Sequence, residues 1–245
     1  MIAVIVVIVI ILVAVLVTGM MQAGHEPTIP LAAGSVTQKT PQATPAPVKS
    51  ARPAVDLYVM SFCPYGTQAE TVMSPVVDLL KSKADIRIRY ITSVTGSTVD
   101  SVKSLHGMAE AKEDLQQICI SKYYPEQYWS YLKTFNDKCY PSWQNATALS
   151  SCRKDTLATL SVDKATIDTC AEGTEGLALL RADATASAND RASASPTLVI
   201  NGVRYSGTRT PEAYKQAICT SFDSAPAECS TALSSASASI ASGNC

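Results

Sequence analysis

One short stretch, VDLYVMSFCPYG at residues 55–66, constrains the fold of this chain more than any other. It begins as a run of apolar and aromatic residues with the length of a buried strand. Cys63 and Pro64 follow, and proline favours the first turn of a helix because its missing N–H is unpaired there. An apolar stripe at helical spacing comes next, formed by Ala69, Val72, Met73, Val76, Val77 and Leu80. Cys63 is therefore predicted to lie where a strand ends and a helix begins.

This position has a chemical consequence for Cys63. The free N–H groups and the dipole at a helix N-terminus stabilise a thiolate over a thiol, which lowers a cysteine pKa and makes the sulfur a nucleophile near neutral pH. The alternative is a structural half-cystine or a buried thiol. The strand–Cys-Pro–helix pattern alone does not choose between them, and a second feature, at Pro196, favours the reactive interpretation.

This second feature is SPTLVINGVRYS at residues 195–206. Thr197–Ile200 is predicted to be a strand, Asn201-Gly202 is the strongest two-residue hairpin signal, and Val203–Tyr205 returns as a second strand. Thr210-Pro211-Glu212 then supplies an N-cap, a first-turn proline and a first-turn acid, which predict a last helix.

Between the two features the apolar period changes. Residues 85–92, DIRIRYIT, alternate in the manner of a second strand, and residues 96–194 show helical spacing. Helices are expected around Met108–Cys119 and Tyr128–Cys139, then from Pro141 to about Cys152, and over residues 163–170 and 175–190. The aromatic residues of this region are expected to pack in its core.

Composition narrows the class of protein. The 245 residues carry a net charge of −1 and no dense basic patch, which argues against nucleic-acid binding. The spread of the eight cysteines, with only two histidines, argues against a metal site and for disulfides in an oxidising compartment. Six of them are expected to be structural: Cys119, Cys139, Cys152, Cys170, Cys219 and Cys229. Cys219 and Cys229 bracket a turn and are expected to pair, whereas the other four allow three connectivities.

The chain ends differ in character from its middle. Residues 1–21 are uncharged and long enough to span a bilayer, which predicts a membrane anchor, with a cleaved signal peptide as the alternative. Residues 22–53 contain six prolines and are predicted to be a linker. Four segments are expected after the linker: residues 54–95 with the first strands and the Cys-Pro helix, the helical block 96–194, residues 195–222 with the hairpin and last helix, and a tail 223–245. The Ser/Ala-rich part of the tail, from Ser230, is predicted to be disordered.

The order strand, Cys-Pro helix, strand, helical block, Ser-Pro-Thr strand, hairpin and helix resembles the thioredoxin superfamily. It is most similar to DsbA-like thiol oxidoreductases, which have an α/β thioredoxin-like fold with a helical insertion. The resemblance implies that Pro196 is cis and lies beside the reactive cysteine. It also implies that Ser195, Pro196 and Thr197 bind substrate, and that Pro64 and Tyr65 tune Cys63. No cofactor and no metal are implied.

A weaker resemblance involves the sequence HGMAE at residues 106–110. It is similar to the His-Gly-x-x-Glu signature of relatives of gamma-interferon-inducible lysosomal thiol reductase, whose flanking cysteines are Ser104 and Ala111 here. His106 is accordingly interpreted as structural. Asp56, at the edge of the first strand, is assigned no role in proton transfer.

The main departure from the DsbA-like pattern is Gly66, which stands where the family's Cys-x-x-Cys motif has its second cysteine. A single thiolate can form a mixed disulfide, but another thiol must resolve it. Three sources are open: the second thiol of the substrate, a small thiol, or a distant cysteine of this chain. Cys245, on the C-terminal tail, is the candidate for the last.

The sequence thus predicts a membrane-anchored protein whose folded domain faces the extracytoplasmic or extracellular side. Thiol–disulfide exchange on protein cysteines is the expected activity, with Cys63 as nucleophile. If the protein is an oxidase, the resemblance implies a membrane redox partner of the DsbB or vitamin K epoxide reductase type. The alternative is a non-catalytic binding or surface-scaffold module that lost redox turnover with the second cysteine; a glutathione transferase fits less well, because its helical domain follows the thioredoxin unit.

Overall fold

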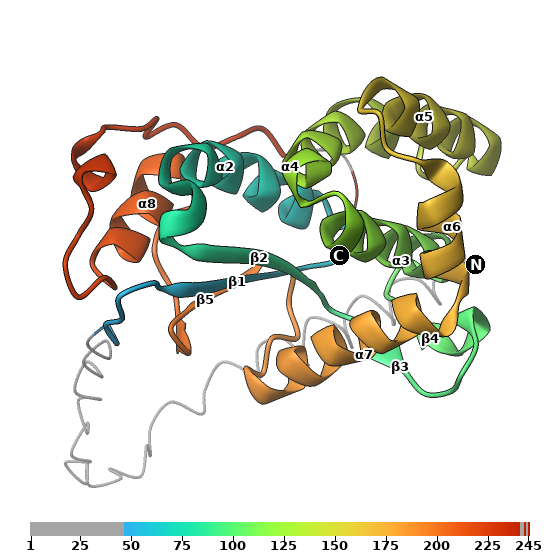
Figure 1. Ribbon diagram of the computed structural model, residues 1–245, viewed down its shortest axis with the longest axis horizontal. Coiled ribbons are helices and arrows are strands. Elements are labelled where there is room, and N and C mark those ends of the chain that lie inside the picture. The colour runs from blue at the N-terminus through green and yellow to red at the C-terminus, as the bar shows by residue number, and fades with distance from the viewer. Residues whose placement is uncertain (1–46, 241–242, 244) are drawn as a thin grey trace, which may run out of the picture. The chain divides into compact units, whose positions relative to one another are not determined.

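A four-stranded mixed sheet lies at the centre of the protein, in a computed structural model that describes residues 47–240, 243 and 245 (Figure 1). Its strands are β1 (Ala54–Val59), β2 (Asp85–Tyr90), β5 (Thr197–Ile200) and β6 (Val203–Arg204), in the order β2-β1-β5-β6. β1 is parallel to β2 and antiparallel to β5, and β5 is antiparallel to β6. Asn201 and Gly202 have φ values of 47° and 77°, as a tight hairpin turn requires, which confirms the predicted turn.

Helices cover both faces of this sheet. α2 (Pro64–Leu80) and α8 (Pro211–Cys219) pack together on one face, and α7 (Thr174–Asn189) crosses the other (Figure 1). The alternation of β1 explains the two layers: Leu57 and its neighbours two residues away belong to the main core, whereas Tyr58 packs with Ala192 and Val199 on the α7 side.

The start of α8 confirms the predicted capping pattern. The Thr210 side chain accepts a hydrogen bond from the Ala213 N–H at 3.2 Å, and Pro211 is the first helical residue.

The helical block interrupts the sheet between β2 and β5. A small hairpin of β3 (Ser93–Val94) and β4 (Val102–Lys103) precedes it. Its helices are α3 (Met108–Tyr123), α4 (Pro125–Thr134), α5 (Ala146–Thr159), α6 (Lys164–Glu172) and α7, and a π-helical turn at Phe135–Cys139 extends α4.

The third helix of the block starts later than predicted. Pro141 lies in a short 3-10 turn, Tyr140–Ser142, and not at the start of α5. The helix begins at Ala146 because the Asn145 side chain caps it and accepts a hydrogen bond from the Ala148 N–H at 3.0 Å.

The C-terminal segment differs from the predicted disordered tail. After a 3-10 turn at Ala227–Ser230, residues 231–238 form hydrogen bonds with α8 and α2. Apolar periodicity is absent from this segment, so sequence patterns gave no sign of docking. The contacts include hydrogen bonds to its main chain, such as that from Lys215 Nζ to the Thr231 carbonyl oxygen at 2.6 Å, and packing of the Leu233 and Ala238 side chains against the core.

The predicted linker ends inside the folded unit. Ser50 forms a bridge with Phe222, in which the Ser50 N–H donates to the Ser221 carbonyl oxygen at 3.0 Å. The predicted anchor, residues 1–21, and most of the linker lie outside the described residues. Among the residues that are described, no helix has both the length and the apolar character needed to cross a bilayer.

Candidate active site

Cys63 lies at the junction of β1 and α2. A turn closes after the strand, in which the Cys63 N–H donates to the Met60 carbonyl oxygen at 3.0 Å. Cys63 is the N-cap residue of α2, its backbone is extended, and Pro64 opens the helix. The Thr67 N–H donates to the Cys63 carbonyl oxygen at 3.0 Å. The sulfur is therefore carried by the residue at the positive end of a long helix.

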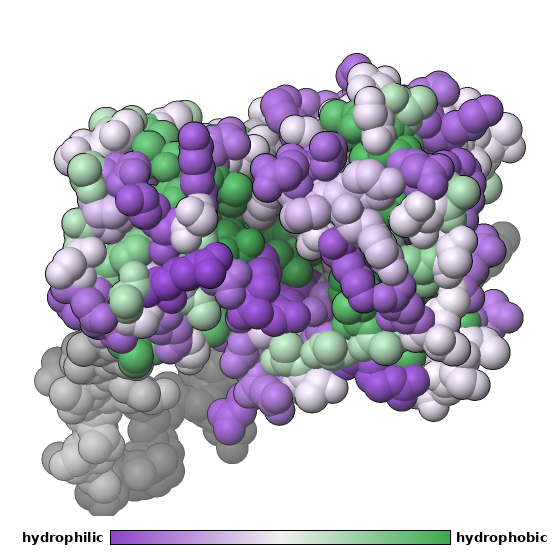
Figure 2. Space-filling model, viewed as in Figure 1, coloured by the Kyte–Doolittle hydropathy of each residue, from purple (hydrophilic) through white to green (hydrophobic). Residues whose placement is uncertain are grey.

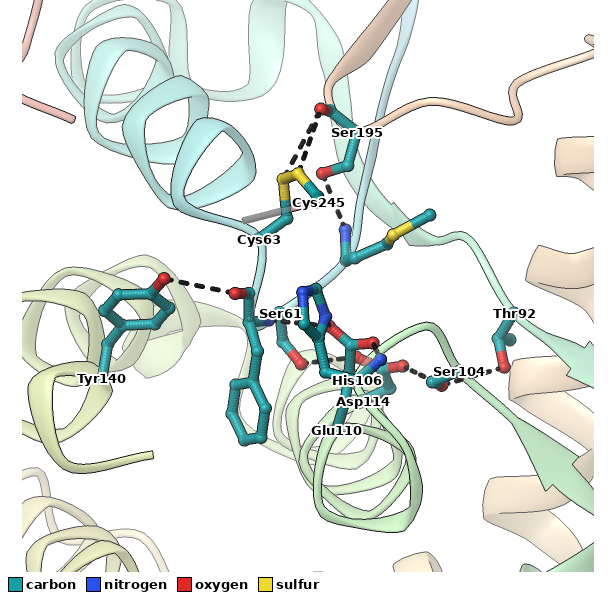
Figure 3. Close-up of polar contacts among 12 residues, drawn as sticks. Ser61, Cys63, Thr92, Ser104, His106, Glu110, Asp114, Tyr140, Ser195 and Cys245 are labelled. Carbon is teal, nitrogen blue, oxygen red and sulfur yellow. Dashed lines mark hydrogen bonds and ion pairs between the residues drawn. A yellow bond between two sulfur atoms is a disulfide. The ribbon is translucent and has the colours of Figure 1, made fainter. Parts of the chain in front are cut away.

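The site brings together three parts of the chain that are far apart in sequence (Figure 3). Cys63 forms a disulfide with Cys245, across a sequence separation of 182 residues and with 5.4 Å between the Cα atoms. The Ser195 carbonyl oxygen lies 3.6 Å from Cys63 Sγ and 4.0 Å from Cys245 Sγ. The Ser195–Pro196 peptide is cis. The two sulfurs thus face the main chain of the segment that the family resemblance assigns to substrate binding.

Gly66 has no room for a side chain. A Cβ atom at this position would lie 2.6 Å from Ser195 Oγ and 3.0 Å from the Met60 carbonyl oxygen. Ser195 Oγ is held there because it accepts a hydrogen bond from the Met60 N–H at 3.0 Å. A side chain at position 66 would therefore require the Ser195 hydroxyl to leave its hydrogen bond with the Met60 N–H.

A buried acid on α3 holds the loop that precedes Cys63. Glu110 Oε1 accepts a hydrogen bond from the Phe62 N–H at 2.9 Å and lies 2.8 Å from His106 Nδ1. Glu110 Oε2 accepts from the His106 N–H at 3.0 Å. Glu110 is fully buried, so its oxygens serve the active-site loop and His106 and not solvent.

A second buried acid, Asp114, lies one helical turn further along α3. It accepts hydrogen bonds from Ser61 Oγ at 2.6 Å and from Ser104 Oγ at 3.1 Å. Burial and the nearby Glu110 carboxyl raise the pKa of Asp114 well above its usual range. Sequence analysis missed both acids, although the HGMAE motif and the four-residue spacing of Glu110 and Asp114 were a usable signal.

The remaining predicted site residues surround this centre. Tyr65 is 41 % exposed at the start of α2. The Thr197 hydroxyl donates to the Ala194 carbonyl oxygen at 2.7 Å and so closes the turn around Pro196. A cavity of about 260 Å³ adjoins this turn and is lined by Pro196, Tyr205, Arg209 and their neighbours. Figure 2 shows that the drawn face is hollowed between the α2 side and the helical block, with apolar residues in the hollow.

The other six cysteines form three disulfides that stabilise the scaffold. Cys119 pairs with Cys170 and joins α3 to α6, and Cys139 pairs with Cys152 and joins the π-helical turn to α5. Cys219, the last residue of α8, pairs with Cys229 in the segment that follows. Among the described residues, no group of three or more His, Cys, Asp or Glu side chains is arranged to hold a metal ion.

The fold is similar to that of known thiol-disulfide oxidoreductases. MdbA, a thiol-disulfide oxidoreductase from Actinomyces oris, superimposes with a TM-score of 0.51 at 13 % identity, over 69 % of this chain and 80 % of that protein. Reduced DsbA1 from Neisseria meningitidis gives a TM-score of 0.52 at 13 % identity, over 72 % of this chain and 87 % of that protein. At this identity the likeness shows the fold. No curated protein sequence matches the chain.

A sequence-family model of the vacuolar sorting receptor thioredoxin-like domain matches residues 87–219. The match extends from within β2 to the end of α8 and includes the helical block and the cis Pro196 turn. It covers more than half of the 245 residues and leaves out the turn at Cys63. The chain therefore belongs to the vacuolar sorting receptor thioredoxin-like domain family, and its fold is the DsbA-like thioredoxin fold that its sequence motifs implied.

Proposed function

We propose that the protein carries out thiol–disulfide exchange on cysteine-containing protein substrates, with Cys63 as nucleophile and Cys245 as resolving thiol. The observation that carries this proposal is the disulfide between these two residues, formed at the N-terminus of α2 and beside the cis Ser195–Pro196 peptide. The fold, shared with proteins described as thiol-disulfide oxidoreductases, supports it.

The proposed reaction moves two electrons in two exchange steps. In the reduced protein the Cys63 thiolate, stabilised by the N-terminus of α2, attacks one sulfur of a substrate disulfide. A mixed disulfide forms, and the other substrate sulfur leaves as a thiolate and takes a proton from water. The Cys245 thiolate then attacks Cys63 Sγ, the Cys63–Cys245 disulfide forms, and the second substrate thiol is released. The reverse sequence oxidises a substrate dithiol.

The turn at Ser195, Pro196 and Thr197 is the proposed substrate-binding segment. Its Ser195 carbonyl oxygen lies within 4.0 Å of both sulfurs and is available to an incoming main-chain N–H once the tail has moved. Pro64 and the exposed Tyr65 flank the approach to Cys63.

We also propose that the folded unit works outside the cytoplasm. The three scaffold disulfides support an oxidising compartment. In this proposal residues 1–21 anchor the protein in a membrane and the proline-rich segment that follows holds the domain away from it. A membrane oxidoreductase of the DsbB or vitamin K epoxide reductase type would then recycle the protein if it acts as an oxidase.

Two variants test the proposed roles. Cys63→Ser is expected to abolish reduction of a disulfide-linked fluorescent peptide, because the nucleophile is lost. Cys245→Ser is expected to form the mixed disulfide with the peptide and to release it slowly. In Cys245→Ser, alkylation of Cys63 should reach half its limiting rate well below pH ~8.5, the unperturbed thiol value. Retained turnover in Cys63→Ser would overturn the proposal.

A non-catalytic binding module is the second candidate function. The family match begins at Arg87, after the Cys63 turn, and the family is named for a receptor. The close contact of Ser195 with Gly66, which leaves little room for a second motif cysteine, also fits this candidate. Under it, Cys63→Ser would bind a substrate peptide as tightly as the wild type, and the wild-type protein would exchange disulfides no faster than free glutathione.

A further inference from the structure

The segment after the Cys219–Cys229 disulfide is attached to the first turns of α8. Lys215 Nζ donates to the Thr231 carbonyl oxygen at 2.6 Å. Glu212 Oε2 accepts from the Leu233 N–H at 2.6 Å, and the Glu212 N–H donates to the Ser234 carbonyl oxygen at 3.0 Å. Three hydrogen bonds to main-chain atoms therefore fix residues 231–234 on one turn of α8.

An ion pair on α8 forms the base of this attachment. Lys215 Nζ lies 2.9 Å from Glu212 Oε1, and the Lys215 side chain is only 4 % exposed. The Lys215 ammonium and the Leu233 N–H hold the pKa of Glu212 below its usual range. A buried charge requires further hydrogen bonds to be tolerated, and the main chain of residues 231–234 supplies them here.

A second attachment lies on α2, nearer to Cys63. Gln68 Nε2 donates to the Ala238 carbonyl oxygen at 2.5 Å. Further along, a Cβ atom on Gly243 would lie 2.9 Å from Tyr140 Oη and 3.5 Å from Pro64 Cδ. The main chain at Gly243 therefore passes close to the turn that carries Cys63, and Cys245 follows two residues later.

We propose that residues 231–238 are a docking segment, and that Glu212, Lys215 and Gln68 are positioning residues that hold Cys245 at Cys63. The inference rests on the proposed function, because it explains how a distant thiol replaces the second cysteine of a Cys-x-x-Cys motif. A flexible tail gives an effective concentration on the order of mM. Attachment at two helices restricts the tail to paths that end near Cys63 and raises this value.

Docking also orders the steps of exchange. In the disulfide state Cys63 is fully buried, whereas Cys245 is exposed. The tail must therefore leave before a substrate disulfide reaches Cys63. Its return delivers the Cys245 thiolate to the mixed disulfide and displaces the substrate from the Ser195 carbonyl oxygen.

The test compares two proline variants of the full chain. Leu233→Pro removes two docking contacts, the N–H that donates to Glu212 and the leucine side chain that packs against the core, and leaves the sequence of α8 unchanged. Ser235→Pro is the matched control, because the Ser235 N–H has no hydrogen-bond partner among the described residues. Each protein is equilibrated in glutathione buffers and quenched with acid, and the fraction of Cys63–Cys245 disulfide is measured by mass spectrometry after alkylation. We expect the effective concentration of Cys245 to fall at least tenfold in Leu233→Pro and to change less than twofold in Ser235→Pro.

A second variant and a second measurement make the outcome decisive. Glu212→Gln removes the charge without altering the tail, and we expect it to lower the effective concentration in the same direction. Far-UV circular dichroism and the three scaffold disulfides report correct folding. An effective concentration within twofold of wild type in both Leu233→Pro and Glu212→Gln would overturn the docking proposal.

The docking proposal and the proposed function fail in different ways. A shift in the glutathione equilibrium without any turnover of the fluorescent peptide would refute the exchange function and leave docking intact. Turnover that depends on Cys63, without a shift in the equilibrium, would refute docking alone.

Discussion

Glu70 offers a quantitative test of the buried polar contacts around α2. It lies on the face of α2 that packs against α4 and the π-helical turn, with its Oε2 accepting a hydrogen bond from Asn136 Nδ2 at 2.6 Å. Glu70 Oε1 and Asn136 Oδ1 are both buried and have no hydrogen-bond partner among the described residues. A proton on Oε1 would supply the missing hydrogen to both oxygens. We therefore expect a neutral Glu70 that donates to Asn136 Oδ1 in a cyclic acid–amide pair.

The magnitude follows from the pKa. Burial, with a smaller contribution from Glu113, raises the pKa of Glu70 from its ordinary 4.5 to about 7. The native state therefore keeps this proton after the unfolded chain has lost it. The contribution of Glu70 to the free energy of unfolding is fully present below pH 4.5. It falls as the pH rises and is lost above about pH 7. Between these two pH values the free energy of unfolding falls by ~1.4 kcal/mol for each pH unit, so the total loss is about 3 kcal/mol.

Glu70→Gln should remove this pH dependence, because glutamine is neutral and can keep both hydrogen bonds to Asn136. Urea unfolding of the disulfide-intact protein, followed by circular dichroism, gives the free energy of unfolding between pH 4.5 and 8.5. The variant should gain stability relative to wild type by about 3 kcal/mol over this range. Asp78→Asn, at an exposed position on the same helix, is the control and should show no such trend.

A flat difference between Glu70→Gln and wild type would refute the reasoning. It would mean that Glu70 is ionised in the native state at neutral pH, with its second oxygen satisfied by water. A gain that appeared equally in Asp78→Asn would trace the effect to net charge instead of to this pair.

Three further predictions concern the active site. Gly66→Ala should lower the free energy of unfolding by about 1–3 kcal/mol through overpacking. In a double-mutant cycle, Ser195→Gly should recover part of this loss. Strictly additive effects of the two substitutions would contradict a contact between position 66 and the Ser195 side chain. Glu110→Ala should lower the free energy of unfolding by about 1–3 kcal/mol, because the Phe62 N–H is left buried without an acceptor. Urea unfolding measures this loss, and an unchanged free energy of unfolding would show that water replaces the carboxylate. Gly243→Ala should lower the effective concentration of the C-terminal thiol in glutathione buffers, because a φ of 146° is unfavourable for alanine; an unchanged value would show that this backbone conformation is not required.

Local chemistry explains which parts of the fold could be predicted from the sequence. The junction at Cys63, the turn at Asn201-Gly202 and the cap at Thr210 each depend on a few adjacent residues. Their signals are steric or involve nearby hydrogen bonds, so they persist whatever the rest of the chain does. The start of α5 was predicted wrongly although its signal is also local: Asn145 caps the helix, but the prediction begins it at Pro141.

Contacts between distant residues explain what could not be predicted. Phe62 and Glu110 are 48 residues apart, and Gln68 and Ala238 are 170 apart. The pairing of Cys119 with Cys170 likewise depends on how α3 meets α6. The docking of the tail was the hardest feature, because most of its hydrogen bonds use main-chain carbonyl and N–H groups that every residue carries, and only two apolar side chains, Leu233 and Ala238, pack against the core. A Ser/Ala-rich sequence looks the same whether or not such groups find partners.

Ser195 contacts both Gly66 and the Cys63–Cys245 disulfide. Ser195 Oγ occupies the space next to Gly66 and accepts a hydrogen bond from the Met60 N–H, so a side chain at position 66 would have to displace it. The Cys63 sulfur faces the Ser195 carbonyl oxygen, and the Cys245 sulfur lies near the same oxygen. Under the proposed function, a resolving thiol at this position would compete with substrate for the same carbonyl. The two proposals together make the tail and the substrate alternatives at one position, and they predict that weaker docking on α8 leaves this position open to substrate more often.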